Sequence, residues 1–121
     1  MKIQESAENY LETIYTLQKR KGQVRSVDIA QDLGYSKPSV SRAMKLLREN
    51  AYIVVAEDGM ITLTESGMAI AENIFERHTL LTQFLEGLGV SHAVAFEDAC
   101  RIEHVISQET FERLRAFVEA G

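Results

Sequence analysis

Apolar and polar positions recur with a helical period through the first third of the chain. Residues 5–19 carry apolar side chains three and four positions apart, which predicts a first helix. A short second helix is expected to begin at Ser26, read as its N-cap, and to stop at Gly34. Ser36 predicts the cap of a third helix, with Pro38 in its first turn, where a missing N–H costs little. The predicted inward positions are Leu11, Ile14, Ile29, Val40, Met44 and Leu47.

The period changes to that of strands over residues 52–63. Two β-branched runs flank an Asp-Gly pair there, which predicts a hairpin. Helical spacing then returns over 65–88, 91–106 and 107–119, so three further helices are expected. The apolar stripe predicted for the first of them is Ile70, Ile74, His78, Leu81, Leu85 and Leu88.

The order of these elements predicts a mostly α fold with a small β wing. A winged helix-turn-helix domain is expected over 1–64, because three helices and a supporting hairpin can bury a small core. A helical domain is expected over 65–121. Its three amphipathic helices are too few to bury all their apolar faces, which favours a second copy of the chain as partner.

Composition and charge narrow the classes of protein. The 121 residues include no apolar run long enough to span a membrane, and the first six residues lack the core of a secretory signal. The one cysteine, Cys100, can form no internal disulfide, so a cytoplasmic protein is expected. The net charge is −5, yet residues 19–48 hold eight basic and two acidic residues. A basic segment on an acidic chain suits a polyanion, although a solvated basic face is equally ordinary.

The layout of residues 25–49 is that of a DNA-reading helix-turn-helix. Gly34 supplies the tight turn, and the following helix exposes hydroxyl and basic side chains that suit phosphates and base edges. Arg42 is long enough to reach base edges in the major groove. The hairpin tip is acidic, so a tight grip on phosphate is not expected there. The candidate DNA-binding residues are Arg25, Ser26, Ser36, Lys37, Pro38, Ser39, Ser41, Arg42 and Lys45.

A second group of residues has the chemistry of a metal site. Cys100, Glu103 and His104 are spaced to project from one side of the predicted fifth helix, nearly opposite its apolar stripe. Thiolate, carboxylate and imidazole together suit a divalent transition metal. His78 is a polar residue within an apolar stripe, and Asn9 and Glu12 lie one helical turn apart in the first helix. A hydrogen-bonded core histidine and a solvated acidic face explain the same residues without a metal.

Three other functions remain open at this point. The first is a winged-helix regulator without metal control, in which the Cys/Glu/His cluster only makes structural contacts. The second is a small metalloenzyme, which is disfavoured because no separate general base or oxyanion donor is evident, so no enzyme is expected. The third is a protein-interaction module that binds no duplex.

Five stretches together resemble the metal-dependent repressors of the diphtheria toxin repressor and manganese transport regulator family. The resemblance covers nearly the whole chain, and the stretch around Cys100 is its most specific part. The matching stretches are residues 7–15, residues 28–30 with 39–41, the Leu63-Thr64…Gly67 entry to the long helix, Arg77-His78, and residues 99–107.

The resemblance implies a winged-helix DNA-binding domain followed by a helical dimerisation domain. It implies repression of metal-homeostasis genes by a homodimer that binds operator DNA when loaded with metal. It also places six residues at family ligand positions: Asn9, Glu12, His78, Cys100, Glu103 and His104.

The ligand positions mix two patterns of the family. Cys100 is the iron-type residue, Glu12 and His78 match the manganese-type site, and Asn9 belongs to neither. A second, ancillary site of the iron-type branch is incomplete, with Thr82 and Phe96 where a carboxylate and a histidine are expected. Because a thiolate favours softer ions, Fe(II) is expected first and Mn(II) second, with Zn(II) or Co(II) binding in vitro.

Overall fold

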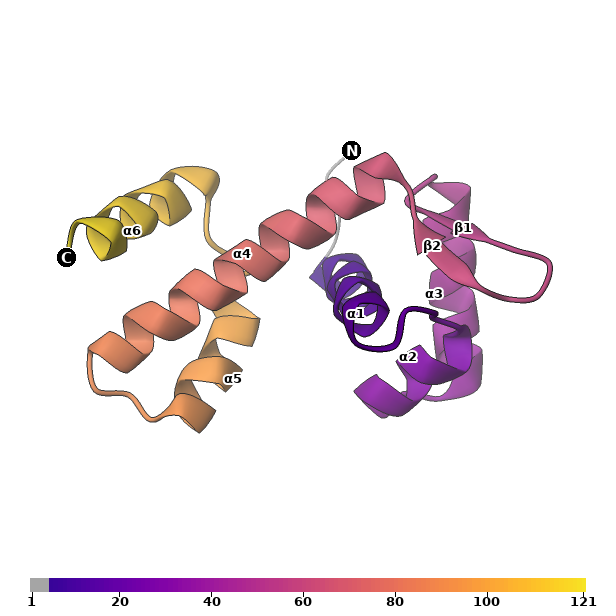
Figure 1. Ribbon diagram of the computed structural model, residues 1–121, viewed down its shortest axis with the longest axis horizontal. Helices are drawn as coiled ribbons and strands as arrows, with labels where there is room; N and C mark the ends of the chain where they lie inside the picture. Colours follow the sequence, from indigo (N-terminus) through magenta and orange to yellow (C-terminus); the bar gives the residue numbers. More distant parts are fainter. Residues whose placement is uncertain (1–4) are drawn as a thin grey trace. The chain divides into compact units, whose positions relative to one another are not determined.

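The computed structural model describes residues 5–121, which form six helices and one two-stranded antiparallel sheet (Figure 1). The predicted fold class, mostly helical with a small wing, is confirmed. The chain divides into two compact units: unit 1 ends at Glu72, and unit 2 is Asn73–Gly121. In chain order the elements are α1 (Glu5–Lys21), α2 (Ser26–Leu33), α3 (Lys37–Glu49), β1 (Ile53–Val55), β2 (Ile61–Leu63), α4 (Glu65–Gly87), α5 (His92–Ile102) and α6 (Gln108–Ala120).

Unit 1 is built around one apolar core that all of its elements share. The six inward positions named above are buried, whereas Val27, another apolar position of the predicted second helix, is 41% exposed. The turn between α2 and α3 depends on Gly34, whose φ of 70° is left-handed and whose N–H donates to the Ala30 carbonyl. Ser36 then caps α3, accepting the Ser39 N–H at 3.3 Å. The expected helix-turn-helix is therefore present.

The start of α2 lies one residue earlier than expected. The N-cap is Arg25, and Ser26 is the first helical residue, so its assignment as the cap was wrong. The reason is Asp28, whose carboxylate accepts the backbone N–H of Arg25 at 2.9 Å. An acidic side chain in the first turn thus satisfies the end of the helix in place of a serine.

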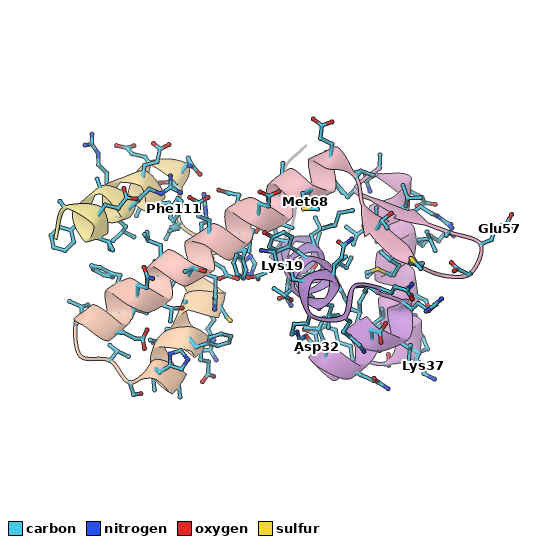
Figure 2. The ribbon with its side chains drawn as sticks, viewed as in Figure 1. Lys19, Asp32, Lys37, Glu57, Met68 and Phe111 are labelled. Atoms are coloured by element: carbon cyan, nitrogen blue, oxygen red, sulfur yellow. The ribbon has the colours of Figure 1, made fainter. Side chains whose placement is uncertain are left out.

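The hairpin pairs β1 with β2 in the register Ile53↔Leu63, Val54↔Thr62 and Val55↔Ile61. Ile53 and Ile61 are buried in the core of unit 1, and the Ile61 N–H donates to the Val24 carbonyl at 2.7 Å. The turn projects away from the helices of the unit, with Glu57 at its tip (Figures 1 and 2). A two-stranded sheet alone is marginal in water, and this anchoring gives the wing its stability.

Unit 2 packs α5 and α6 with the part of α4 that follows Glu72. Phe111 of α6 is fully buried, as are Ala95 and Ala99 of α5 (Figure 2). Two members of the predicted α4 stripe, Ile74 and Leu81, are buried. Leu88 was expected in that stripe but follows the last helical residue and is 66% exposed.

The fifth helix is four residues shorter than predicted. It ends at Ile102, and a turn of residues 103–106 leads into α6. Glu103 and His104 therefore lie on this turn and not on a polar helix face, and Glu103 is buried, not solvated. The guanidinium of Arg77 takes the carbonyls of Glu103 and Ile106, so neither is left for helical pairing.

Candidate metal centre and nucleic-acid interface

The candidate nucleic-acid interface is the outer face of α3 and its cap. Ser36, Lys37, Pro38, Ser41, Arg42 and Lys45 are exposed, and Ser39 is half-buried. Lys37 stands at the start of α3 (Figure 2). Arg42 lies one turn after Ser39, its Nη2 3.4 Å from the Ser39 Oγ. A helix that presents small hydroxyls at its start and long cations further along suits close approach to a duplex.

Internal ion pairs hold other basic residues of unit 1. Arg20 pairs with Asp32 at 3.0 Å, and Lys21 pairs with Asp28 at 2.8 Å. By contrast, none of the four cations of α3 has a carboxylate partner within the part of the chain that the structure describes. The basic surface of the segment is therefore concentrated on α3. The four cations are Lys37, Arg42, Lys45 and Arg48.

Arg25 and Ser26, also predicted to bind DNA, are half-buried beside the wing. The Arg25 Nε donates to the Asp58 carbonyl at 3.2 Å, and its Nη2 lies 3.5 Å from the Asp58 carboxylate. Arg25, which the sequence predicted to contact DNA, is thus paired with the acidic tip of the wing.

Sequence reasoning missed Arg48. It lines a hollow of about 180 Å³ together with Ser26, Ser41, Lys45, Met44 and Val55. Arg48 follows Lys45 by three residues on the same helix, and this spacing is the signal that would have found it.

Two groups in unit 1 have displaced pKa values. Burial raises the pKa of Tyr10, the nearby Tyr35 adds to the effect, and the Arg42 guanidinium opposes it. The hydrogen bond from Lys21 lowers the pKa of Asp28, and the bond from the Arg25 backbone adds to it. Neither group is a candidate DNA or metal contact, so both shifts belong to the framework that holds α2 and α3.

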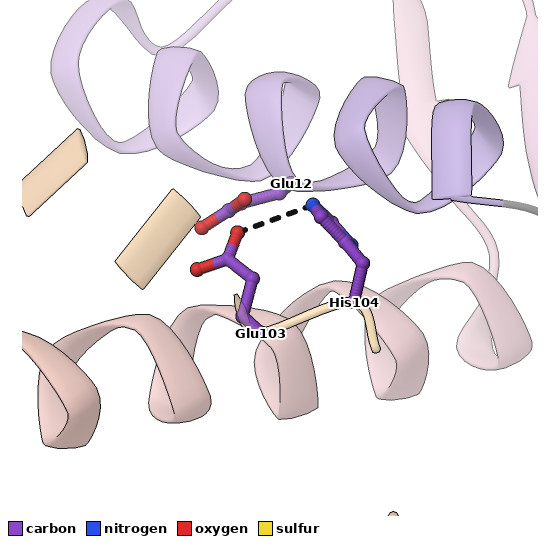
Figure 3. A group of neighbouring side chains, drawn as sticks. All are labelled: Glu12, Glu103 and His104. Carbon is purple, nitrogen blue, oxygen red and sulfur yellow. Dashed lines mark ion pairs between the residues drawn. The ribbon is translucent and has the colours of Figure 1, made fainter. Parts of the chain in front are cut away.

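The candidate metal centre gathers four side chains of unit 2, with Glu103 among them. The Nδ1 of His78 lies 2.9 Å from Glu103 Oε2 and 3.8 Å from the Sγ of Cys100. The other carboxylate oxygen, Oε1, lies 3.4 Å from the Nε2 of His104 (Figure 3). Imidazole nitrogens from α4 and the turn thus lie beside one carboxylate, and a thiol from α5 lies beside the first imidazole.

These donors are withdrawn from water to different degrees. The side chains of Glu103, His104 and His78 are 1%, 3% and 12% exposed, whereas Cys100 is exposed. The ring of Phe96 packs edge-on against His78, with ring centres 4.5 Å apart, and the Thr82 hydroxyl donates to the His78 carbonyl. The neighbours of His78 therefore fix its ring orientation.

The donor set fits a divalent transition metal. A hydrogen bond to Glu103 is also what an ordinary core histidine would make, so that contact alone decides nothing. A second imidazole on the same carboxylate and a thiol beside the first exceed what such a histidine needs. A buried carboxylate among nitrogen and sulfur donors is costly without compensating charge, and a bound cation supplies that charge.

Asn9 and Glu12 lie on α1 in unit 1, and both are half-buried. The backbone carbonyl of Asn9 accepts the Thr13 hydroxyl at 2.8 Å. They are one helical turn apart, as the sequence predicted. Their part in a metal site stays a prediction.

Both parts of the chain match domains of known protein families. Residues 2–60 match the iron-dependent repressor N-terminal DNA-binding domain. Residues 64–120 match the iron-dependent repressor metal-binding and dimerisation domain. The transcriptional regulator MntR of Escherichia coli O6:H1 is 36% identical over 115 residues, which are 95% of this chain and 74% of MntR.

Solved structures agree with these matches. The manganese regulator SloR has a TM-score of 0.83 at 28% identity over the whole chain and 56% of its own. A manganese-dependent transcriptional repressor in complex with manganese has a TM-score of 0.86 at 30% identity, over 93% of this chain and 52% of its own. The IdeR protein of T. acidophilum has a TM-score of 0.80 at 26% identity, over 98% of this chain and 55% of its own. The chain thus spans about half the length of these structures.

The family carries the partners expected from the sequence: its domains are DNA-binding, metal-binding and dimerising. Two of these structures are manganese regulators by name, which does not support the order in which Fe(II) was expected before Mn(II). No helix among residues 5–121 combines the length and apolar character that crossing a bilayer requires. Two matched domain models and a relative of 36% identity lead to one conclusion: this chain belongs to the iron-dependent repressor family of metal-dependent transcriptional regulators.

Proposed function

We propose that this protein is a cytoplasmic, metal-activated repressor that binds operator DNA as a homodimer and controls metal-homeostasis genes. Residues 1–64 read the DNA, and residues 65–121 bind metal and pair two subunits. The observation that carries this proposal is the arrangement of four potential metal donors: His78 and His104 lie beside the Glu103 carboxylate, and Cys100 lies beside His78. A donor set of this kind in a chain with a helix-turn-helix ties metal binding to DNA binding.

The proposed ligands come from both halves of the chain. Glu12 and Asn9 of α1 join the four donors of unit 2, so that one cation favours a single relative pose of the DNA-reading and pairing parts. A metal shifts the population toward that pose by no more than its difference in affinity for the two states. In the dimer, this pose sets the recognition helices about 34 Å apart, one turn of the duplex.

The proposed DNA surface is α3 and its approach. Arg42 reads base edges in the major groove. The other contacts, mainly to the phosphate backbone, come from Arg25, Ser26, Ser36, Lys37, Pro38, Ser39, Ser41 and Lys45. Binding to such a surface weakens steeply with salt, because each phosphate contact releases counterions.

The physiological ion is proposed to be Fe(II), on the ground that Cys100 offers a thiolate. Mn(II) is the second candidate, and one specific observation favours it: SloR and the similar repressor solved with manganese are manganese regulators by name. No enzymatic reaction is proposed for the site.

The central experiment measures DNA binding against free metal. Duplexes are first selected from a random 30-base-pair library with the protein and Mn(II), under anaerobic conditions. Affinity for the selected duplex is then measured with chelator, with Mn(II) and with Fe(II). We expect metal to raise the affinity by about 5–150-fold, the usual range of allosteric coupling. Equal affinity with and without chelator would instead support a winged-helix regulator without metal control.

The choice of ion is tested by replacing the thiol. We expect Cys100→Glu to move the preference toward Mn(II), because it exchanges a soft donor for a hard one. Calorimetric titration of the wild type and the variant with both ions measures the change. The same ratio of Mn(II) to Fe(II) affinity in both proteins would remove Cys100 from the ligand set.

A further inference from the structure

Arg77 is a buried cation that connects three segments of unit 2. Arg77 is 8% exposed. Its Nη1 donates to the Glu103 carbonyl at 3.1 Å and to the Ile106 carbonyl at 2.8 Å. Its Nη2 donates to the Gln108 side-chain oxygen at 2.9 Å. One side chain of α4 therefore holds both ends of the 103–106 turn and the first residue of α6.

Glu103 is held at two points by consecutive residues of α4. His78 contacts its carboxylate at 2.9 Å, and Arg77 binds its backbone carbonyl at 3.1 Å. His104, the next donor, follows Glu103 directly on the turn. Backbone hydrogen bonds tie the turn to the end of α5, and the bonds that Arg77 makes tie it to α4, the helix that carries His78.

We propose that Arg77 is the positioning residue of the metal centre: it holds the Glu103–His104 turn at the distance from His78 and Cys100 that a cation requires. This inference rests on the proposed function, because it concerns the same site. Arg77 is not itself a ligand, since a guanidinium is cationic and has no lone pair to donate at neutral pH. Its effect on metal passes through Glu103 and His104.

The planar fork of arginine is what this role needs. Two carbonyls and one amide oxygen accept from two nitrogen atoms of the same guanidinium. A lysine ammonium keeps the charge but does not reproduce this fixed fan of donors. Arg77→Lys therefore separates geometry from charge.

The matched control is Arg115, which lies against the same aromatic ring. The guanidinium carbons of Arg77 and Arg115 lie 5.3 and 4.7 Å from the centre of the Phe111 ring. Arg115 pairs with Glu76, and no described hydrogen bond joins it to the 103–106 turn. Arg115→Lys thus perturbs the same core without touching the donors.

The experiment titrates the wild type, Arg77→Lys and Arg115→Lys with Co(II) alone, under anaerobic conditions. The readout is the thiolate-to-cobalt absorption band, assigned by its loss in Cys100→Ser. We expect Arg77→Lys to bind Co(II) 10–100-fold more weakly, the usual effect of losing a group that orients a ligand. Arg115→Lys is expected to stay within about twofold of the wild type, the scatter for a group that touches no ligand.

Urea unfolding of the metal-free proteins separates positioning from stability. Similar losses of stability in both arginine variants, with a loss of Co(II) affinity in Arg77→Lys alone, support the proposal. Equal Co(II) affinities in the two variants overturn it. If Arg77→Lys does not fold, Gln108→Ala removes one anchor of the guanidinium, and an unchanged Co(II) affinity there overturns the proposal. A wild type without a Cys100-dependent band would instead refute the proposed ligand set, and the inference with it.

Discussion

The two units place their functional polar groups in opposite environments. In unit 1, the candidate DNA contacts stand on the outer face of α3 over an apolar core, and Arg42 and Lys45 are exposed. In unit 2, three of the four candidate metal donors are largely buried, with the Glu103 side chain 1% exposed, whereas Cys100 is exposed. Exposed cations cost the free protein little folding free energy, because water solvates them. The buried carboxylate of Glu103 carries a desolvation cost that a bound cation would reduce.

Both units expose large apolar side chains, but in unit 2 some of these side chains line a hollow. Unit 2 leaves Leu88, Val105 and Phe117 exposed by 66%, 71% and 70%. Phe84, Leu88 and Phe117 line one hollow of about 260 Å³. Large exposed apolar side chains around a hollow mark a contact surface. Unit 1 therefore buries a core of its own, whereas unit 2 presents buried donors that suit an ion and an apolar hollow that suits a partner.

The largest expected effect is loss of the buried donors. Glu103→Ala and His104→Ala should each abolish metal-stimulated DNA binding, because each removes a donor from a set that leaves few alternatives. Circular dichroism of the metal-free variants should show an intact fold. The control is Glu97→Ala, an exposed carboxylate of α5 that pairs with the exposed Arg101. Metal-dependent binding retained in both donor variants would contradict the site.

Next in size is the apolar surface of unit 2. Phe117→Glu should raise the dimer dissociation constant by about 100-fold or more, because a symmetric interface loses the side chain twice at roughly 1.5–3 kcal/mol each. Sedimentation equilibrium of the protein measures it. Leu46→Glu, at a 60% exposed leucine of α3 in unit 1, should leave dimerisation unchanged. Equal effects of the two substitutions would move the interface away from Phe117.

A pair of glycines on α4 compares the packing of the two units. A Cβ at Gly67 would lie 2.0 Å from the Tyr52 carbonyl oxygen, whereas one at Gly87 would meet nothing within 4 Å. Gly67→Ala should lower the free energy of unfolding by about 1–3 kcal/mol or more. Gly87→Ala should raise it by about 0.4–1 kcal/mol through the unfolded chain. Urea unfolding checks both, and a neutral Gly67→Ala would mean that α4 can move away from the hairpin.

Unit 1 could be predicted closely because its signals are local. Ser36 and Pro38 mark the start of α3, Gly34 marks the turn, and apolar spacing gives the buried face. The first exception was the cap of α2, where Asp28 binds backward to Arg25 and displaces Ser26 from that role. This bond is also local, but a serine followed by apolar residues is an equally good N-cap pattern.

Unit 2 was less predictable because its decisive contacts are distant in sequence. Glu103, the first residue after α5, is bound by Arg77 and His78. These two residues lie 26 and 25 positions earlier in the chain. Helical spacing alone extended α5 to 106 and placed Glu103 on a solvated face. The residue types of the candidate site were identified, whereas the turn that carries two of them was not.

A smaller effect is expected at the reading surface. Arg42→Ala should weaken binding to the selected duplex by about 1–3 kcal/mol if it reads a base edge, with metal affinity unchanged. The matched control is Arg20→Ala, because Arg20 pairs with Asp32 away from α3. Fluorescence anisotropy at several salt concentrations separates a base contact from a phosphate contact, which would instead reduce the salt slope by about one. Unchanged affinity would remove Arg42 from the interface.

The smallest expected effect is a pH dependence within unit 1. Lys21 and the Arg25 backbone lower the pKa of Asp28, so its charged form stabilises the fold. This stabilisation is complete above the unfolded pKa near 3.9 and is lost as the pH falls through the folded value. Asp28→Asn should therefore lower the free energy of unfolding at pH 7 by about 0.5–1 kcal/mol, with the difference shrinking below about pH 4. Urea unfolding at pH 3–7 tests this, with Asp32→Asn, whose ion pair is more exposed, as control. A constant difference across that range would mean that Asp28 acts through its hydrogen bonds as an uncharged cap, and not through its charge.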